Sequence, residues 1–333
     1  MPLSAADLAS LGETPITLRS TAFANVYLRL DGSGVSSPAD YGGGLVNCQY
    51  TAGSYEQFRV RPQSDGSHAF ESVAFPKVYL RMDGSGVTTQ TTSGGGTVNC
   101  QYGSGGPGPY EKFHAGPQPD GSFSLESIAF PKVYLRLNGT GVTAFSGSGG
   151  GTVNCQFAAD GGVHEKFLLE PADQRLDFRM QHQQQTQWCW AATAASVELF
   201  YNPASQWTQC AVVDAEVGRS DCCGGAGSVY PCNQPWWLDR ALQRVGHYNQ
   251  IMGPMTTLQL ATELTHALPV GTRVGWAGGG GHFMVLRARF VADGVEYVSV
   301  ADPWYGDSDV TDASYRNAYQ GSGTWTHSYK TKR

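Results

Sequence analysis

The first half of the chain repeats itself three times, and this repetition limits the possible folds more than any other feature. The motif Val-Tyr-Leu-Arg recurs after 52 and then 55 residues, and two further motifs keep step with it. The copies are Val-Tyr-Leu-Arg at 26–29, 78–81 and 133–136, Val-Asn-Cys-Gln at 46–49, 98–101 and 153–156, and Glu-Gln/Lys-Phe at 56–58, 111–113 and 165–167. Three structural units of nearly equal length are therefore expected.

Each unit has the pattern of about four short strands. Apolar and polar residues alternate within the segments, and Gly, Asp-Gly or Pro turns separate them. Three such units are too few for a solenoid, and each is too small to stand alone. Closing them around one axis buries their Val, Leu and Phe side chains together. The sequence therefore predicts an all-β β-trefoil over residues 12–170, with repeats at about 14–68, 69–122 and 123–170.

One cysteine occurs in each repeat, and its neighbours indicate a position in the core. Cys48, Cys100 and Cys155 each follow a valine by two positions and precede an aromatic residue by two. This alternation puts them on the apolar face of a strand, where a thiol acts as a small hydrophobic group. The turn sequence at 31–34, Asp-Gly-Ser-Gly, is typical of a tight turn between strands, which we favour over a metal-binding loop.

Over about residues 12–170 the sequence resembles bacterial fascin-like trefoil domains. The Gln-any-Trp signature of ricin-type lectin trefoils is missing, and the first tryptophan of the chain is Trp188. The resemblance implies a module that binds a glycan or a protein ligand. Sugar binding rests on analogy alone.

The segment around Cys189 carries the strongest chemical signal. Cys189 precedes the small-residue run at 191–197, which predicts a helix to about Tyr201. A helix N-terminus favours negative charge, which suits a thiolate nucleophile. The amide of Gln183, six positions upstream, can join the Cys189 N–H as the second donor of an oxyanion hole. Gln184 takes this place if the helix starts one residue later. The structural alternatives are a buried cysteine in an apolar helix and a polar glutamine linker.

A histidine and a carboxylate that suit this nucleophile lie far downstream. His282 follows four glycines and begins an apolar strand at 282–291, and a turn at 292–294 leads into a second strand at 295–300. Asp302 comes directly after that strand. Two adjacent strands of a hairpin would place His282 beside Asp302, so that the carboxylate orients the imidazole towards a nucleophile.

These residues, in this order and spacing, resemble the active site of papain-like cysteine proteases. The most similar group is the bacterial one that includes staphopains and plant-pathogen avirulence proteases, and the resemblance covers about residues 178–333. Aspartate stands where papain itself has asparagine. The resemblance implies an α+β domain of two lobes with the substrate in the cleft between them. It also implies that Gln183 stabilises the oxyanion, Cys189 with Trp190 after it attacks, His282 is base and then acid, Asp302 orients it, and Trp304 shields their contact.

Four further cysteines, Cys210, Cys222, Cys223 and Cys232, cluster in a glycine-containing stretch. Two disulfides are expected there, because the adjacent Cys222 and Cys223 are poorly placed to pair with each other and each should bond to Cys210 or Cys232. A zinc site with four thiolates is the alternative, although the adjacent pair lacks the usual two-residue gap. The papain-like resemblance also implies disulfides near this point.

Composition excludes several classes of partner. The formal net charge of −6 argues against nucleic acid, and no apolar stretch approaches the length of a membrane span. The acidic run at 306–312 lacks the central glycine and terminal glutamate of an EF-hand, so a solvated acidic turn is favoured and a calcium loop is the alternative. No cofactor is expected. The chain starts without a recognisable signal peptide, whereas the cysteine cluster indicates a secreted or exported protein. A cytoplasmic location is the alternative.

Together these features predict a two-domain cysteine endopeptidase that acts on proteins or peptides, with a trefoil as targeting module. Mushroom chimerolectins have a similar layout, although their trefoil is of the ricin type. The alternatives are a lectin-like binding protein with weak or lost activity and an acyltransferase or transglutaminase that uses the same triad. Hydrolysis and transfer share a thioester intermediate, so the residues do not separate them.

Overall fold

A computed structural model describes residues 3–160 and 162–333. The chain divides into two compact units, the first extending to Ala172 and the second spanning Asp173–Arg333. Among the described residues, no helix combines the length and the apolar character that crossing a membrane requires.

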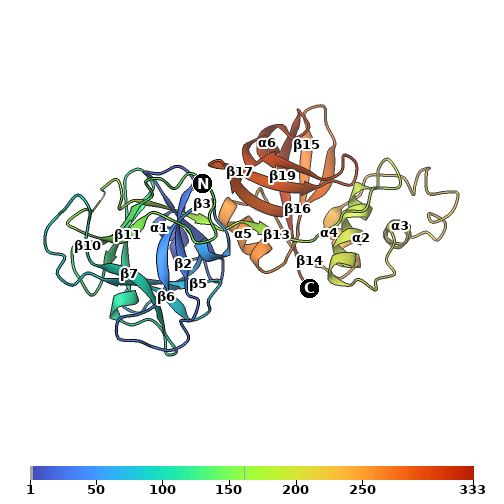
Figure 1. The fold of residues 1–333 in the computed structure, drawn as a ribbon. Coiled ribbons are helices and arrows are strands. Elements are labelled where there is room, and N and C mark those ends of the chain that lie inside the picture. The colour runs from blue at the N-terminus through green and yellow to red at the C-terminus, as the bar shows by residue number, and fades with distance from the viewer. Residues whose placement is uncertain (1–2, 161) are drawn as a thin grey trace. The chain divides into compact units, whose positions relative to one another are not determined.

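The first unit is a β-trefoil, as the repeats predict (Figure 1). Six strands, β1, β4, β5, β8, β9 and β12, pair antiparallel in a closed ring, and the remaining six form three hairpins. Each repeat contributes two barrel strands and one hairpin, so the threefold pattern of the sequence becomes a threefold arrangement in space. The strands are β1 (Ile16–Ser20), β2 (Val26–Asp31), β3 (Leu45–Tyr50), β4 (Gln57–Pro62), β5 (His68–Ser72), β6 (Val78–Asp83), β7 (Thr97–Tyr102), β8 (Phe113–Pro117), β9 (Phe123–Ser127), β10 (Val133–Asn138), β11 (Thr152–Phe157) and β12 (Phe167–Pro171).

The repeated motifs lie at equivalent places in this core. The phenylalanines of the third motif, Phe58, Phe113 and Phe167, are fully buried. Their position follows a short 3₁₀ turn at Ser54–Glu56 and, in the second repeat, at Pro109–Glu111. Burying one aromatic side chain per repeat against the common axis contributes about 2–3 kcal/mol each before the entropy of ordering is counted.

The trefoil cysteines lie where the loop of one repeat meets a hairpin of the next. Gly43 bridges to Cys100, Gly95 to Cys155 and Gly150 to Cys48, which links the three repeats in a cycle. All three thiols are buried, as predicted, and burial raises the pKa of each to about 12. Only glycine fits beside them: Gly44 has φ +63°, and a Cβ there would lie 2.5 Å from Cys100 Sγ.

The arginine of the first motif pairs with the glutamate of the third in every repeat. The arginine Nε lies 3.9, 3.8 and 3.6 Å from the glutamate Oε1, and all six side chains are buried. Leaving either charge unpaired in this core would cost several kcal/mol. The pair therefore fixes the first motif of each repeat in place relative to the third. The pairs are Arg29 with Glu56, Arg81 with Glu111, and Arg136 with Glu165.

Both units begin earlier in the chain than the expected limits of 12–170 and 178–333. The helix α1 (Ala5–Leu8) packs in the first unit, where Leu8 and Leu11 are buried and the Leu3 N–H donates to the Leu169 carbonyl. The second unit begins at Asp173 rather than near residue 178 because the strand β13 (Gln174–Arg175) pairs with a strand of its sheet.

The second unit joins a group of helices to an antiparallel sheet (Figure 1). The sheet runs in the order β14-β19-β15-β16-β17-β18, with β13 added beside β16. One apolar core lies between the helices α2, α3 and α4 and the sheet, and a second lies between the sheet, α5 and α6. The elements are α2 (Cys189–Tyr201), α3 (Gln209–Val217), α4 (Leu238–Arg244), β14 (Tyr248–Met252), α5 (Thr257–Thr265), β15 (Val270–Trp276), β16 (Gly281–Ala292), β17 (Val295–Ala301), β18 (Ser308–Thr311), α6 (Asp312–Ala318) and β19 (Gly323–Thr331).

Two elements that the sequence predicted are present at the expected residues. The helix α2 starts at Cys189 and ends at Tyr201, and β16 and β17 form the expected hairpin. Its turn residues, Asp293 and Gly294, have φ of 50° and 74°, the left-handed conformation that a two-residue hairpin turn requires.

Candidate functional site

Cys189 is the first residue of α2, and two tryptophans fix its position. Trp188 and Trp190 are buried, and their indole N–H groups donate to the carbonyls of Cys232 and Gln234 at 2.8 and 3.0 Å. The small side chains that follow allow α2 to be buried along most of its length. Cys189 itself is a free thiol and only half-buried, in contrast to the three thiols of the trefoil.

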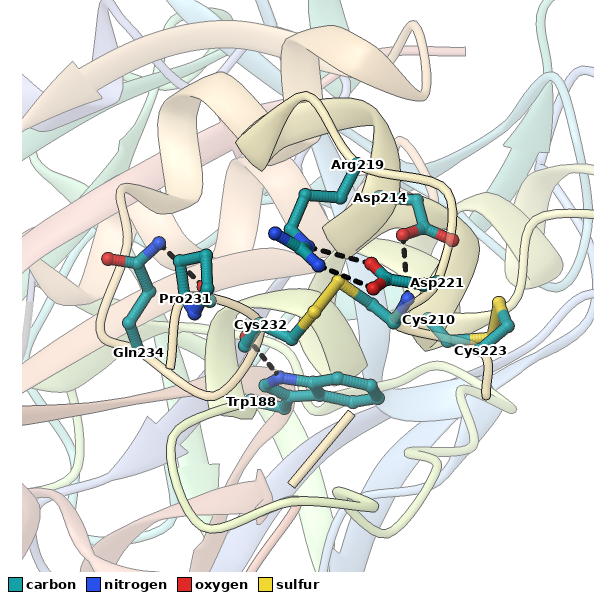
Figure 2. The surroundings of a disulfide bond; sticks show 10 residues. Trp188, Cys210, Asp214, Arg219, Asp221, Cys223, Pro231, Cys232 and Gln234 are labelled. Carbon is teal, nitrogen blue, oxygen red and sulfur yellow. Dashed lines mark hydrogen bonds and ion pairs between the residues drawn. A yellow bond between two sulfur atoms is a disulfide. The ribbon is translucent and has the colours of Figure 1, made fainter. Parts of the chain in front are cut away.

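The loop that receives these tryptophans is held by two disulfides, Cys210–Cys223 and Cys222–Cys232. The expected pair of disulfides is thus present, and its four sulfurs are bonded to one another rather than available as zinc thiolates. Figure 2 shows Trp188 beside Cys232, with Arg219 paired to Asp221 close by, and Cys232 is the residue that is disulfide-bonded to Cys222. The cross-links therefore support the wall on which the start of α2 rests.

His282 and Asp302 lie together, as the hairpin predicts. His282 Nε2 is 2.7 Å from Asp302 Oδ1, and both residues are buried. The other ring nitrogen of His282 faces Cys189, to which the imidazole hydrogen-bonds. Asp302 Oδ1 also accepts from the backbone N–H groups of Trp304 and Tyr305 at 2.7 and 2.9 Å. These donors help to keep this oxygen of the carboxylate beside the imidazole.

The charges of this pair stabilise each other. Burial opposes the charged imidazole, but hydrogen bonds to Asp302 and Cys189 outweigh it and raise the pKa of His282 to about 9. Burial likewise opposes the carboxylate, but the hydrogen bond from His282 and the two backbone donors hold the pKa of Asp302 below its ordinary value. At neutral pH the pair is therefore an imidazolium beside a carboxylate.

Gln183 lies in the same pocket as Cys189. Its backbone N–H donates to the Pro303 carbonyl at 2.8 Å, which ties it to the segment that carries Asp302. Its Nε2 donates one hydrogen to the Gln185 carbonyl at 2.8 Å, and an amide nitrogen has a second hydrogen to offer. The Oε1 is buried without a hydrogen-bond partner among the described residues. Gln184, the alternative, is exposed, and its backbone N–H bonds to Gln209.

Cys189, His282 and Gln183 line one pocket of about 380 Å³. The helix α2 contributes Cys189 and the strand β16 contributes His282, so the pocket lies where the helices meet the sheet. Aromatic rings make up much of the remaining lining, and polar groups lie between them. The lining includes Gln183, Thr186, Gln187, Trp190, Pro235, Trp236, Trp276, Phe283, Trp304 and Tyr305.

The structure places Trp304 differently from the shielding position that the resemblance implies. Its ring stacks on His182, and the side chain is 46% exposed. The rings that contact His282 are those of Trp276, stacked at 6.2 Å, and Tyr305, edge-on at 6.1 Å. Trp276 is six residues before His282, on the neighbouring strand β15, and sequence reasoning did not find it because no local pattern links the two positions.

A protein family matches the second unit. Residues 172–320, somewhat less than half of the chain, match the family described as papain-like cysteine protease AvrRpt2. This match, which covers most of the second unit, identifies that unit as a papain-like cysteine protease domain. The domain belongs to the AvrRpt2 family.

A search of curated proteins found no match to this sequence. Among solved structures, a mosquitocidal holotoxin matches with a TM-score of 0.37 and 10% identity over 52% of this chain and 21% of its own. An arabinofuranosidase bound to arabinofuranosyl-alpha-1,2-xylobiose matches with a TM-score of 0.31 and 16% identity over 48% and 31%. The Haemophilus ducreyi cytolethal distending toxin matches with a TM-score of 0.34 and 10% identity over 51% and 89%. This chain thus spans less than a third of the length of the first two.

Proposed function

We propose that the protein is a cysteine endopeptidase whose second domain hydrolyses peptide bonds through Cys189, His282 and Asp302, with Gln183 as oxyanion donor. The observation that carries this proposal is the pocket that brings together the half-buried Cys189 thiol, His282 and the Gln183 amide, with Asp302 bonded to His282. Asp302 supports the positive charge on His282, so an imidazolium lies beside the Cys189 sulfur.

The residues suit each step of acyl transfer. The Cys189 sulfur attacks the substrate carbonyl carbon, and the resulting oxyanion is held by the Gln183 amide and by the Cys189 N–H, which has no acceptor within its own helix. His282 donates its proton to the leaving amine as the C–N bond breaks, leaving a thioester on Cys189. His282 then takes a proton from water as that water attacks the thioester, and the acid product leaves with the thiolate restored.

A peptide library analysed by mass spectrometry tests the hydrolysis. The expected result is a set of products with new free carboxyl termini, formed by the wild-type protein and not by Cys189→Ala. Added amine nucleophiles separate the two reactions, because an acyltransferase or transglutaminase would give amide products in preference to acids. Absence of both products, with Cys189 reduced and the protein folded, would favour the alternative of a binding protein.

We further propose that the trefoil binds a carbohydrate or protein target. Its second repeat has a cavity of about 510 Å³, whose lining includes the rings of Tyr79, Tyr102 and Tyr110 and the polar side chains of Gln101 and Arg81. Aromatic faces with a few polar groups suit a sugar ring or an extended peptide. Cleavage of a bound glycoprotein should weaken in Tyr110→Ala, because local concentration is lost, while cleavage of a short soluble peptide stays at the wild-type rate.

We also propose that the protein acts after export from a reducing cytosol. Two disulfides in one loop support this location, because such bonds persist in oxidising compartments. Fractionation of the producing cells, with thiols trapped at lysis, should recover the oxidised protein outside the cytosol. Recovery of a fully reduced, active protein from the cytosol would contradict it.

A further inference from the structure

The buried hydroxyl of Tyr319 contacts the second oxygen of the Asp302 carboxylate. Tyr319 Oη donates to Asp302 Oδ2 at 2.8 Å, whereas the hydrogen bonds from His282 and the two backbone groups all go to Oδ1. Tyr319 is 2% exposed. Burial and the neighbouring carboxylate raise the pKa of Tyr319 well above its ordinary range, so the hydroxyl keeps its proton and stays a donor.

The backbone holds this tyrosine firmly. Tyr319 ends α6, and its N–H and carbonyl exchange hydrogen bonds with Gly323 at 2.8 and 2.7 Å. Gly323 in turn lies against the Trp276 ring so closely that a Cβ would be 2.8 Å from it. Trp276 in turn stacks on His282. The turn at 319–323 therefore contacts Asp302 directly, through the Tyr319 hydroxyl, and reaches His282 indirectly, through the Trp276 ring.

We propose that Tyr319 is a positioning residue of the reaction, which acts through Asp302 by keeping the carboxylate directed at His282. This inference rests on the proposed cysteine-protease function. Without the hydroxyl, Oδ2 would be a buried carboxylate oxygen that loses its donor, and the carboxylate would be free to turn or to admit water. Either change weakens the support of the imidazolium and, through it, of the Cys189 thiolate.

The titratable groups around this contact are few among the described residues. His282 faces the carboxylate from β16, Tyr315 and Tyr319 face it from α6 and its end, and Cys189 faces His282 from α2. Tyr305 lies edge-on to His282. Tyr315 is equally buried and packs against Tyr319, but its hydroxyl pairs with Thr272 rather than with the carboxylate. Tyr315→Phe is therefore a matched control.

The test compares the wild-type protein with Tyr319→Phe and Tyr315→Phe across pH. Two quantities are measured: kcat/KM on a short peptide, and the rate at which iodoacetamide alkylates Cys189, read at that residue by mass spectrometry. Tyr319→Phe should lower kcat/KM by about tenfold, mostly in kcat, as expected for one lost hydrogen bond to a charged group. Its alkylation midpoint should rise, and the alkaline midpoint of kcat/KM should fall. Tyr315→Phe should leave both midpoints unchanged even if it lowers the melting temperature.

A double-mutant cycle tests whether Tyr319 acts through Asp302, and a melting curve of each variant shows that it is folded. In an Asp302→Asn background, adding Tyr319→Phe should change kcat/KM and the alkylation midpoint less than twofold, because the carboxylate through which Tyr319 acts is gone. A further tenfold loss there, or wild-type midpoints in Tyr319→Phe, would overturn the positioning role. A wild-type protein that cleaves no peptide refutes the proposed function instead, and the alkylation midpoints still decide the role of Tyr319.

Discussion

The two units contain the same thiol group in opposite environments. The trefoil buries Cys48, Cys100 and Cys155 between repeats, where desolvation raises the pKa of each to about 12. The protease domain leaves Cys189 half-buried at the start of a helix, with an imidazolium as its neighbour. The comparison teaches that residue type does not make a nucleophile. What differs is the access to solvent and the charge beside the sulfur.

The largest effect on turnover is expected from removing the nucleophile. Cys189→Ala should lower kcat on a peptide by at least roughly 10⁴-fold, because nothing else in the pocket can form the thioester. Its melting temperature should stay close to the wild-type value. Cys100→Ala is the matched change in the trefoil, and it should do the reverse, costing about 1 kcal/mol or more of stability and leaving peptide cleavage intact. Activity of Cys189→Ala within tenfold of the wild-type value would show that Cys189 is not the nucleophile.

The next largest effect is expected at the oxyanion donor. Gln183→Ala should lower kcat by about 10² to 10³-fold, the usual result of losing one such donor. Alkylation of Cys189 should stay fast, since His282 and Asp302 are untouched. Gln184→Ala is the control, because that side chain is exposed. A loss confined to Gln184→Ala would show that the wrong glutamine was assigned.

Activity and stability of the protease domain should both depend on pH through His282. Because the pKa of His282 is raised to about 9, kcat/KM should fall about tenfold per pH unit above that value as the imidazolium loses its proton. The stability of the protease domain should also decrease as pH rises. A folded pKa above the unfolded value of about 6.5 stabilises the protease domain fully below pH 6.5, by on the order of 3 kcal/mol, and this is lost as pH rises towards 9.

Alkylation of the native protein checks the same contrast on the trefoil side. The trefoil thiols, with pKa values near 12, should remain unlabelled at pH 9 while Cys189 is fully labelled. An alkaline limit of activity near pH 7 would contradict the support that Asp302 gives to His282.

The smallest effect on turnover is expected from reduction of the disulfides. Each bond should contribute about 2–4 kcal/mol to the protease domain, so reductant at high dose should lower its unfolding temperature. The trefoil transition should not move, since its cysteines are free thiols. Turnover at 25 °C should fall only a few-fold, because the loop supports the wall behind α2 and contains no reacting group. Non-reducing peptide mapping should recover Cys210 with Cys223 and Cys222 with Cys232.

Local patterns were enough for much of this molecule. The repeat period and the alternation within it predicted a twelve-strand trefoil, since each strand's pattern depends only on its own residues and the units must close on one another. The small-residue run placed the start of α2 at Cys189, and an Asp-Gly turn predicted the hairpin that brings His282 beside Asp302. Each of these features can be recognised from the order of residues along the chain, without knowledge of how distant elements pack.

Other features were decided only by the tertiary structure. Four cysteines could pair in more than one way, and which sulfurs meet depends on how α3 packs behind α2. Trp276 and Tyr319 reach His282 and Asp302 from elements that no sequence period connects to the site. The physical reason is that periodicity reports which face of an element is buried. The partner that the buried face meets is set by the packing of the whole domain.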